Sequence, residues 1–193
     1  LVQSRGDACF AMARIAYILL CHKDPVAIIK QAERLTASGD YMSIHFDASA
    51  SPTDFAQITQ ALGKNPNVTF ASKRIRCGWG EWSLVQATLN AVESAIDAFP
   101  RATHFYMLSG DCMAIKSAAH AHERLAADPA DWIESVDFFT GGWIKTGMSD
   151  ERLTRWHFLN ERDRKGLFYA SLAVQRRFNI TRRLPADIRP MIG

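Results

Sequence analysis

The chain has 193 residues, of which 48% are hydrophobic, and carries a formal net charge of +3. This length and composition exclude a disordered chain and favour one domain with a sizeable core, alone or within a larger protein. The four cysteines form no C-x-x-C pair, which argues against a zinc ribbon or a redox motif. No apolar run approaches the roughly 18 residues of a membrane-spanning helix. Lysine and arginine gather after Arg152, but acidic residues are interspersed among them, so a solvated helix face is favoured over a nucleic-acid partner.

The first half of the chain alternates between strand and helix patterns. Asp24 followed by Pro25 is typical of a helix start, because aspartate caps the first turn and proline suits the first helical position. Ser51 followed by Pro52 gives the same signal for a second helix. In chain order we expect a strand over residues 14–21, a helix over 25–38, a strand over 41–46, a helix over 52–63 and a strand over 68–71.

The second half begins with the clearest helix pattern, over residues 82–99. Ser83 is the expected N-cap, and Pro100 ends the helix. The apolar stripe that should face the core consists of Leu84, Val85, Thr88, Leu89, Val92, Ala95 and Ile96. The elements expected after it are a strand over residues 104–108, a helix from 117 to about 127, a strand over 132–139 and a helix over about 164–178.

We expect a single domain over residues 1–193. It should consist of an α/β core over about 14–140 and a mainly helical extension over 141–193. The chain starts at Leu1 and stops at Gly193 without a helix stop or a charged tail, so we expect it to be C-terminally incomplete.

Polar residues follow three of the expected strands. Alternating strands and helices predict a mostly parallel sheet, and such sheets bind ligands at the carboxyl ends of their strands. Asp47 follows the second strand, where a carboxylate commonly accepts hydrogen bonds from a ribose diol. The alternative is that Asp47 caps the loop over residues 49–51, and the spacing leaves both interpretations open. The three polar ends are Cys21-His22-Lys23, His45-Phe46-Asp47 and Ser109-Gly110-Asp111.

Several common motifs are missing from the sequence. It contains no G-x-G-x-x-G, no Walker A motif and no G-x-S-x-G, which argues against a dinucleotide fold, a P-loop enzyme and an α/β-hydrolase. His120 and His122 diverge on a helix, so we assign no metal site to them. The sequence also lacks Asp-x-Asp, the pair on which many nucleotide-sugar transferases hold Mg²⁺ or Mn²⁺. Cationic side chains would then neutralise the leaving nucleotide.

Four segments in order resemble the core-2/I-branching β-1,6-N-acetylglucosaminyltransferase and peptide O-xylosyltransferase family. They cover residues 16–23, 44–47, 79–90 and 106–117, and the resemblance runs from about Arg14 onward and weakens after Glu151. It implies an α/β fold of GT-A type, which is a Rossmann-like nucleotide-binding fold with a mostly parallel sheet. It also implies a UDP-sugar donor, inversion at the anomeric carbon, and neither a required metal nor another cofactor.

The resemblance also assigns roles to individual residues. Asp47 matches an acid that contacts the uridine portion of the donor, and Cys112 stands where the family has an acid. Either Asp111 takes over that role or the loop has shifted. The family's catalytic glutamate lies downstream, so we expect the base beyond Gly193, with Asp111 as the candidate within the chain. The residues predicted to bind the donor are His22, Lys23, His45, Asp47, Trp82, Ser109, Gly110 and Asp111.

The leading hypothesis is the donor-binding half of a metal-independent, inverting glycosyltransferase that moves GlcNAc or xylose from a UDP-sugar to a glycan or protein acceptor. The isolated chain is expected to be inactive. One alternative is a nucleotide- or carbohydrate-binding module without turnover, and another is an unrelated Rossmann-like enzyme with a different cofactor. The resemblance places eukaryotic members in the Golgi membrane, while bacterial relatives lack the anchor and would be cytoplasmic or membrane-associated. We expect a bacterial-type member.

Overall fold

The computed structural model describes residues 13–128, 130–131, 133, 135–141 and 150–192. The chain divides into two compact units, with the division between Pro129 and Ala130. The single domain predicted over residues 1–193 stays a prediction, and the compact first unit ends before the expected core boundary near residue 140.

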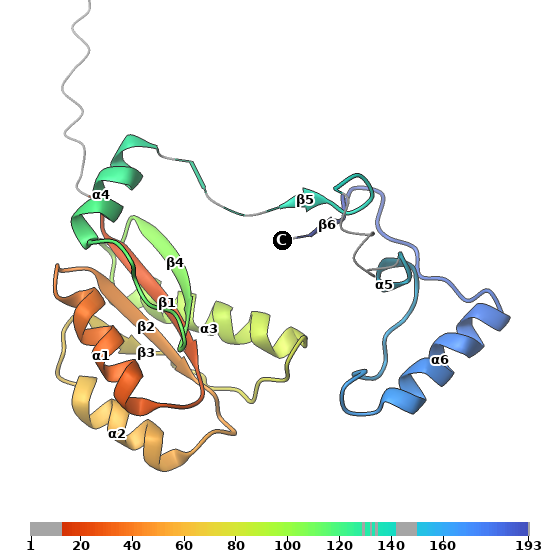
Figure 1. Cartoon of the computed structure of the whole chain (residues 1–193), viewed down its shortest axis with the longest axis horizontal. Coiled ribbons are helices and arrows are strands. Elements are labelled where there is room, and N and C mark those ends of the chain that lie inside the picture. Colours follow the sequence, from red (N-terminus) through yellow and green to blue (C-terminus); the bar gives the residue numbers. More distant parts are fainter. Residues whose placement is uncertain (1–12, 129, 132, 134, 142–149, 193) are drawn as a thin grey trace, which may run out of the picture. The chain divides into compact units, whose positions relative to one another are not determined.

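The first unit is built on a four-stranded parallel sheet (Figure 1). Its strands are β1 (Ile15–Cys21), β2 (Tyr41–Phe46), β3 (Val68–Phe70) and β4 (His104–Ser109), in the spatial order β3-β2-β1-β4. The α/β fold with a mostly parallel sheet, consistent with the GT-A type, is therefore confirmed. All six residues of β2 are at least partly buried, because a central parallel strand has helices over both faces.

Helices cover both faces of this sheet. They are α1 (Pro25–Thr36), α2 (Pro52–Leu62), α3 (Trp82–Ala98) and α4 (Ala118–Ala127). Residues of α1, α2 and α4 pack with alternate residues of β1, including Tyr17 and Leu19, whereas α3 packs with the other set, Ala16 and Ile18. The helices lie on different faces because the chain reverses direction across the sheet. Right-handed crossovers toward β2 and β3 lie on one face, and the crossover back to β4 lies on the other.

The helix starts predicted at Asp24, Ser51 and Ser117 are confirmed. The side chains of Asp24, Ser51 and Ser117 each accept a hydrogen bond from the first turn of the helix that follows. Ser83 was predicted wrongly, because α3 begins at Trp82 with Glu81 at the cap position. The Ser83 hydroxyl instead accepts the Gly78 N–H at 2.9 Å, so it fixes the preceding loop.

The face of α3 that contacts the sheet also differs from the prediction. Val85, Leu89 and Ile96 from the predicted stripe are 43–54% exposed. The buried face is made of small residues, which let the helix axis approach the sheet closely enough for Ser43 Oγ to donate to the Ala91 carbonyl at 2.7 Å. The residues buried on α3 are Ala87, Asn90, Ala91, Ser94 and Ala95.

The second unit contains short elements and one longer helix. They are β5 (Val136–Asp137), α5 (Glu151–Thr154), α6 (Lys165–Arg177) and β6 (Met191–Ile192), and β5 pairs antiparallel with β6. The strand predicted over residues 132–139 is shorter in its described part, because the Asp137 side chain accepts the N–H groups of Phe139 and Thr140 and turns the chain. Trp132 and Glu134, which fall in that predicted strand, lie outside the described residues.

Within the described ranges, no helix combines the length and the apolar character needed to cross a membrane.

Candidate functional site

The polar ends of β1, β2 and β4 lie side by side at the carboxyl edge of the sheet. Leu20, near the end of β1, is in register with His45 on one side and Ser109 on the other. The chain leaves β1 toward β2 and β3 and later returns to β4 on the opposite side. Crevices that bind ligands form at such switch points, because the two crossovers diverge there. The fold therefore gathers the predicted residues at an edge suited to a ligand.

Residues from β1 and β4 meet directly at this edge. The Gly110 N–H donates to the Leu20 carbonyl at 3.1 Å, which extends the ladder by one residue. Beyond it, Lys23 Nζ lies 3.4 Å from an Asp111 carboxylate oxygen, and both side chains are more than half exposed. An ion pair this exposed stabilises the fold little. Both groups therefore remain accessible to a ligand.

The start of α1 is occupied by its own cap. The Asp24 carboxylate accepts the Ala27 N–H at 3.0 Å, and Asp24 adopts a left-handed conformation with φ of 54°. Helix starts that cradle phosphates leave their N–H groups open and carry no negative side chain. This start therefore lacks the phosphate cradle of dinucleotide-binding folds, in agreement with the missing glycine motif.

Gly110 packs tightly against β1 and α1, and we expect Gly110→Ala to destabilise the first unit by about 1 to 3 kcal/mol. An added Cβ would lie 3.0 Å from Ile28 Cδ1 and 3.1 Å from Cys21 Cβ. Chemical unfolding of both variants and the parent measures the effect. Gly166→Ala is the matched control, because an added Cβ there meets nothing within 4 Å. Equal stability of the two variants would contradict the close packing of Gly110.

Asp47 holds two loops together at the edge. Its carboxylate accepts the Ser49 N–H at 2.6 Å, the Ser49 hydroxyl at 2.6 Å and the Cys77 N–H at 2.9 Å. Burial would raise the pKa of Asp47, but these hydrogen bonds outweigh it and hold the pKa below its usual value. The stabilising effect of the ionised form is thus present above about pH 3.9 and is lost as the pH falls below that value. Loop capping is therefore present, and the donor contact stays a prediction.

His45 lies beneath the surface of this edge. It is 1% exposed, and its Nε2 accepts the Ile75 N–H at 3.1 Å, so the ring is neutral in this arrangement. Burial is the main reason that the pKa of His45 is lowered. The ring positions the loop after β3 in this structure, and its predicted contact with the donor stays untested.

Arg74 is a residue of this edge that the sequence analysis missed. Its guanidinium donates to the carbonyls of Phe46 at 2.8 Å and Asp47 at 3.1 Å, and it lies 3.7 Å from the ring centre of Phe55. These contacts fasten the loop after β3 over the end of β2. The available signal was the basic pair Lys73-Arg74, which follows the third predicted strand after Ser72.

The loop after β4 is fixed by short polar contacts. Ser109 Oγ lies 3.2 Å from Cys112 Sγ, and the Gln31 side chain donates to the Cys112 carbonyl at 2.7 Å. The hydrogen bond from the Ser109 side chain is the main reason that the pKa of Cys112 is lowered. Cys112 and Asp111 thus both lie at the edge, and the transfer of the family's acid role from position 112 to Asp111 stays a prediction.

Trp82 stands at the first position of α3 and is 69% exposed. This exposure excludes packing of the indole into the core of this unit, and its contact with the donor stays a prediction. His122, considered above as a metal ligand, instead contacts both Asp40 oxygens at 2.8 and 2.9 Å, near the amino ends of the strands. No group of three histidine, cysteine, aspartate or glutamate side chains in the described part of the chain is placed to hold a metal ion.

Two comparisons with known proteins match this region. A family model described as Core-2/I-Branching enzyme matches residues 15–159, which is more than half of the chain. The chain is also similar to a human protein, beta-1,3-galactosyl-O-glycosyl-glycoprotein beta-1,6-N-acetylglucosaminyltransferase 3, with 30% identity over 112 residues. That alignment covers 58% of this chain and 25% of the human protein, so the chain spans about a quarter of the length of this relative.

Proposed function

Because the chain belongs to the core-2/I-branching enzyme family, we propose that it is the donor-binding part of a glycosyltransferase that uses a UDP-sugar. The sugar is GlcNAc or xylose, and the name of the human relative favours GlcNAc. The observation that carries the proposal is the gathering of three polar strand ends at the switch point of the sheet, inside the segment that matches the family.

The reaction proposed is a single displacement. The oxygen of an acceptor hydroxyl forms a bond to the anomeric carbon while the bond from that carbon to the UDP oxygen breaks. A carboxylate base takes the hydroxyl proton, and UDP leaves with the electron pair. One displacement inverts the configuration at the anomeric carbon. The base is unassigned, and Asp111 is the candidate within this chain.

The residues at the edge have complementary roles in this proposal. The Asp47 carboxylate accepts a hydrogen bond from the uridine portion on Oδ2, which accepts one hydrogen bond in this structure, whereas Oδ1 accepts two. Lys23 contributes positive charge beside the nucleotide, and Asp111 orients it through their ion pair. The acceptor is a glycan or a glycosylated protein, by analogy with the acceptor in the printed name of the human relative.

We expect UDP to bind without a divalent metal ion. The sequence lacks Asp-x-Asp, so the diphosphate charge is left to lysine and arginine side chains. Calorimetric titration of UDP in EDTA and in Mn²⁺ should give affinities within about tenfold of each other, a difference of at most roughly 1.4 kcal/mol. A larger gain in Mn²⁺ would contradict metal independence, and the absence of UDP binding in both buffers would contradict the proposed function.

A further inference from the structure

The second unit presents two parallel aromatic rings on its surface. Trp156 is 45% exposed and Phe158 is 75% exposed. Their ring centroids are 6.1 Å apart, and the ring planes are within 9° of parallel. They are two residues apart in a segment without helical structure, where alternate side chains point to the same side. The two rings are therefore stacked against each other, and each keeps part of its surface exposed to solvent.

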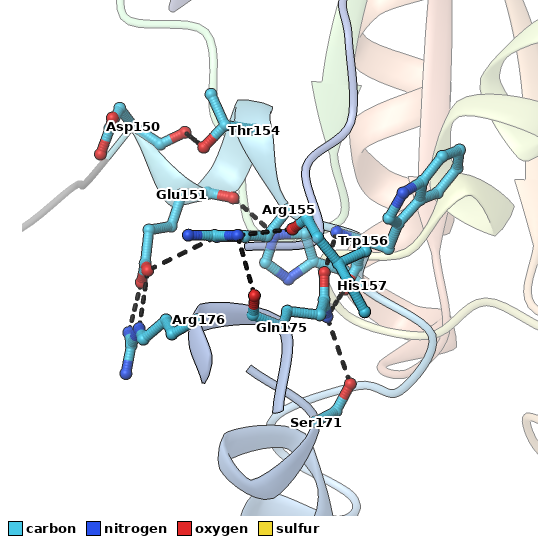
Figure 2. Close-up of polar contacts among 10 residues, drawn as sticks. Asp150, Glu151, Thr154, Arg155, Trp156, His157, Ser171, Gln175 and Arg176 are labelled. Carbon is cyan, nitrogen blue, oxygen red and sulfur yellow. Dashed lines mark hydrogen bonds and ion pairs between the residues drawn. The ribbon is translucent and has the colours of Figure 1, made fainter. Parts of the chain in front are cut away.

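Buried polar contacts hold the backbone that carries these rings. Gln175 is 4% exposed, and its side chain accepts the Trp156 N–H at 2.8 Å and donates to the Trp156 carbonyl at 2.9 Å (Figure 2). The same amide also donates to Ser171 Oγ at 3.3 Å. Burying an amide costs free energy unless its hydrogen bonds are made. Here the oxygen and the nitrogen of the Gln175 amide both bond to the backbone of Trp156. The backbone that carries the exposed indole is thus held in place.

Charged groups near the rings are partly paired with one another. Figure 2 shows the Glu151 carboxylate between the guanidiniums of Arg155 and Arg176, and both form ion pairs with it. Arg155 also donates to the carbonyl of Gln175 at 3.2 Å. One carboxylate offsets only one of these two positive charges, so the pairing leaves a net positive charge beside Trp156.

One guanidinium remains beside the indole face. The Arg182 guanidinium carbon lies 5.8 Å from the ring centre of Trp156. The backbone N–H of Arg182 donates to the Thr154 carbonyl at 2.7 Å. A flat aromatic face attracts the weakly positive C–H groups on one side of a pyranose ring, because the π-system is negative on its face. A guanidinium at the rim can donate hydrogen bonds to the sugar hydroxyls.

From this combination we propose that Trp156, Phe158 and Arg182 form a carbohydrate-binding subsite on the second unit. The inference rests on the proposed function, since it identifies where this chain holds part of its acceptor. Gln175 is a positioning residue, because it acts on the sugar only through the backbone of Trp156.

The test is a titration of the full 193-residue chain with a β-1,3-galactosyl disaccharide glycoside, followed by the five tryptophan indole N–H signals in NMR. The signal missing from Trp156→Phe identifies Trp156, and in the parent this signal should shift as the disaccharide binds. Phe158→Ala should weaken binding by about fivefold. Phe178→Ala is the matched control, because Phe178 is also exposed, at 71%, and lies outside the aromatic pair. Its affinity should equal that of the parent.

Three results would overturn the inference. They are an unshifted Trp156 signal at saturating disaccharide, equal affinities of Phe158→Ala and Phe178→Ala, and a shift caused by inorganic phosphate at lower concentration than by the disaccharide. Thermal unfolding of both phenylalanine variants checks that they are folded. A UDP titration of the same samples separates this subsite from the donor site. Disaccharide binding without UDP binding would support the subsite and count against the proposed donor function.

Discussion

Asp47→Ala should weaken the binding of UDP and lower the stability of the first unit at the same time. Loss of a charge-assisted hydrogen bond to the nucleotide should cost about 1.5 to 3 kcal/mol, or roughly tenfold to 100-fold in affinity. Loss of the carboxylate also leaves the partly buried Cys77 N–H without its acceptor, which costs about 1 to 3 kcal/mol of unfolding free energy. Calorimetry with UDP and urea unfolding measure the two effects separately.

Ser49→Ala is the control that separates the two roles of Asp47. It removes the hydroxyl that donates to the Asp47 carboxylate and leaves the carboxylate itself in place. We expect a small loss of stability and an unchanged affinity for UDP. If Asp47→Ala loses stability but binds UDP as the parent does, Asp47 is only a loop anchor and its assignment to the donor is wrong.

Asp40→Ala should cost more stability than Asp47→Ala, about 3 to 5 kcal/mol, without a direct effect on UDP binding. Asp40 is fully buried before β2, where it accepts the Ile15 N–H at 2.9 Å and contacts His122 of α4. The variant leaves the buried Ile15 N–H without its acceptor and His122 without its partner. Urea unfolding measures the loss.

The location of Asp40 makes this prediction selective. The residue lies at the amino ends of the strands, whereas the candidate site lies at their carboxyl ends. Asp97→Ala, on the exposed surface of α3, is the control and should change stability by no more than about 0.5 kcal/mol. A loss below about 1 kcal/mol for Asp40→Ala would show that this pair does not hold α4 on the core.

Features set by neighbouring residues could be predicted from the sequence. The caps at Asp24, Ser51 and Ser117 follow from a side chain that bonds within its own helix turn. The parallel sheet follows from the alternation of strands and helices, and this alternation also brings the polar strand ends to one edge.

Features set by long-range contacts could not be predicted. The buried face of α3 depends on how closely the helix approaches β2, and Ser43 reaches across to it from 48 positions away in the chain. The partners of Asp47 and His45 lie in the loop after β3, at Cys77 and Ile75, and no local pattern pairs them. His45 was predicted as a ligand contact because it lies at the carboxyl end of an expected strand. A central parallel strand buries both of its faces, so a place near the strand end does not by itself make a side chain accessible.

The most direct test of the donor site is a map of the backbone amide signals that shift in NMR when UDP is added to the chain. The proposal predicts the largest shifts at the carboxyl edge, at His22, Lys23 and Gly110, with smaller changes in the loop that contains Cys77. Signals at the amino ends of the strands, such as those of Gly39 and Asp40, should remain in place. Absence of shifts at the carboxyl edge, or larger shifts at Gly39 and Asp40, would contradict a nucleotide site at the switch point of this sheet.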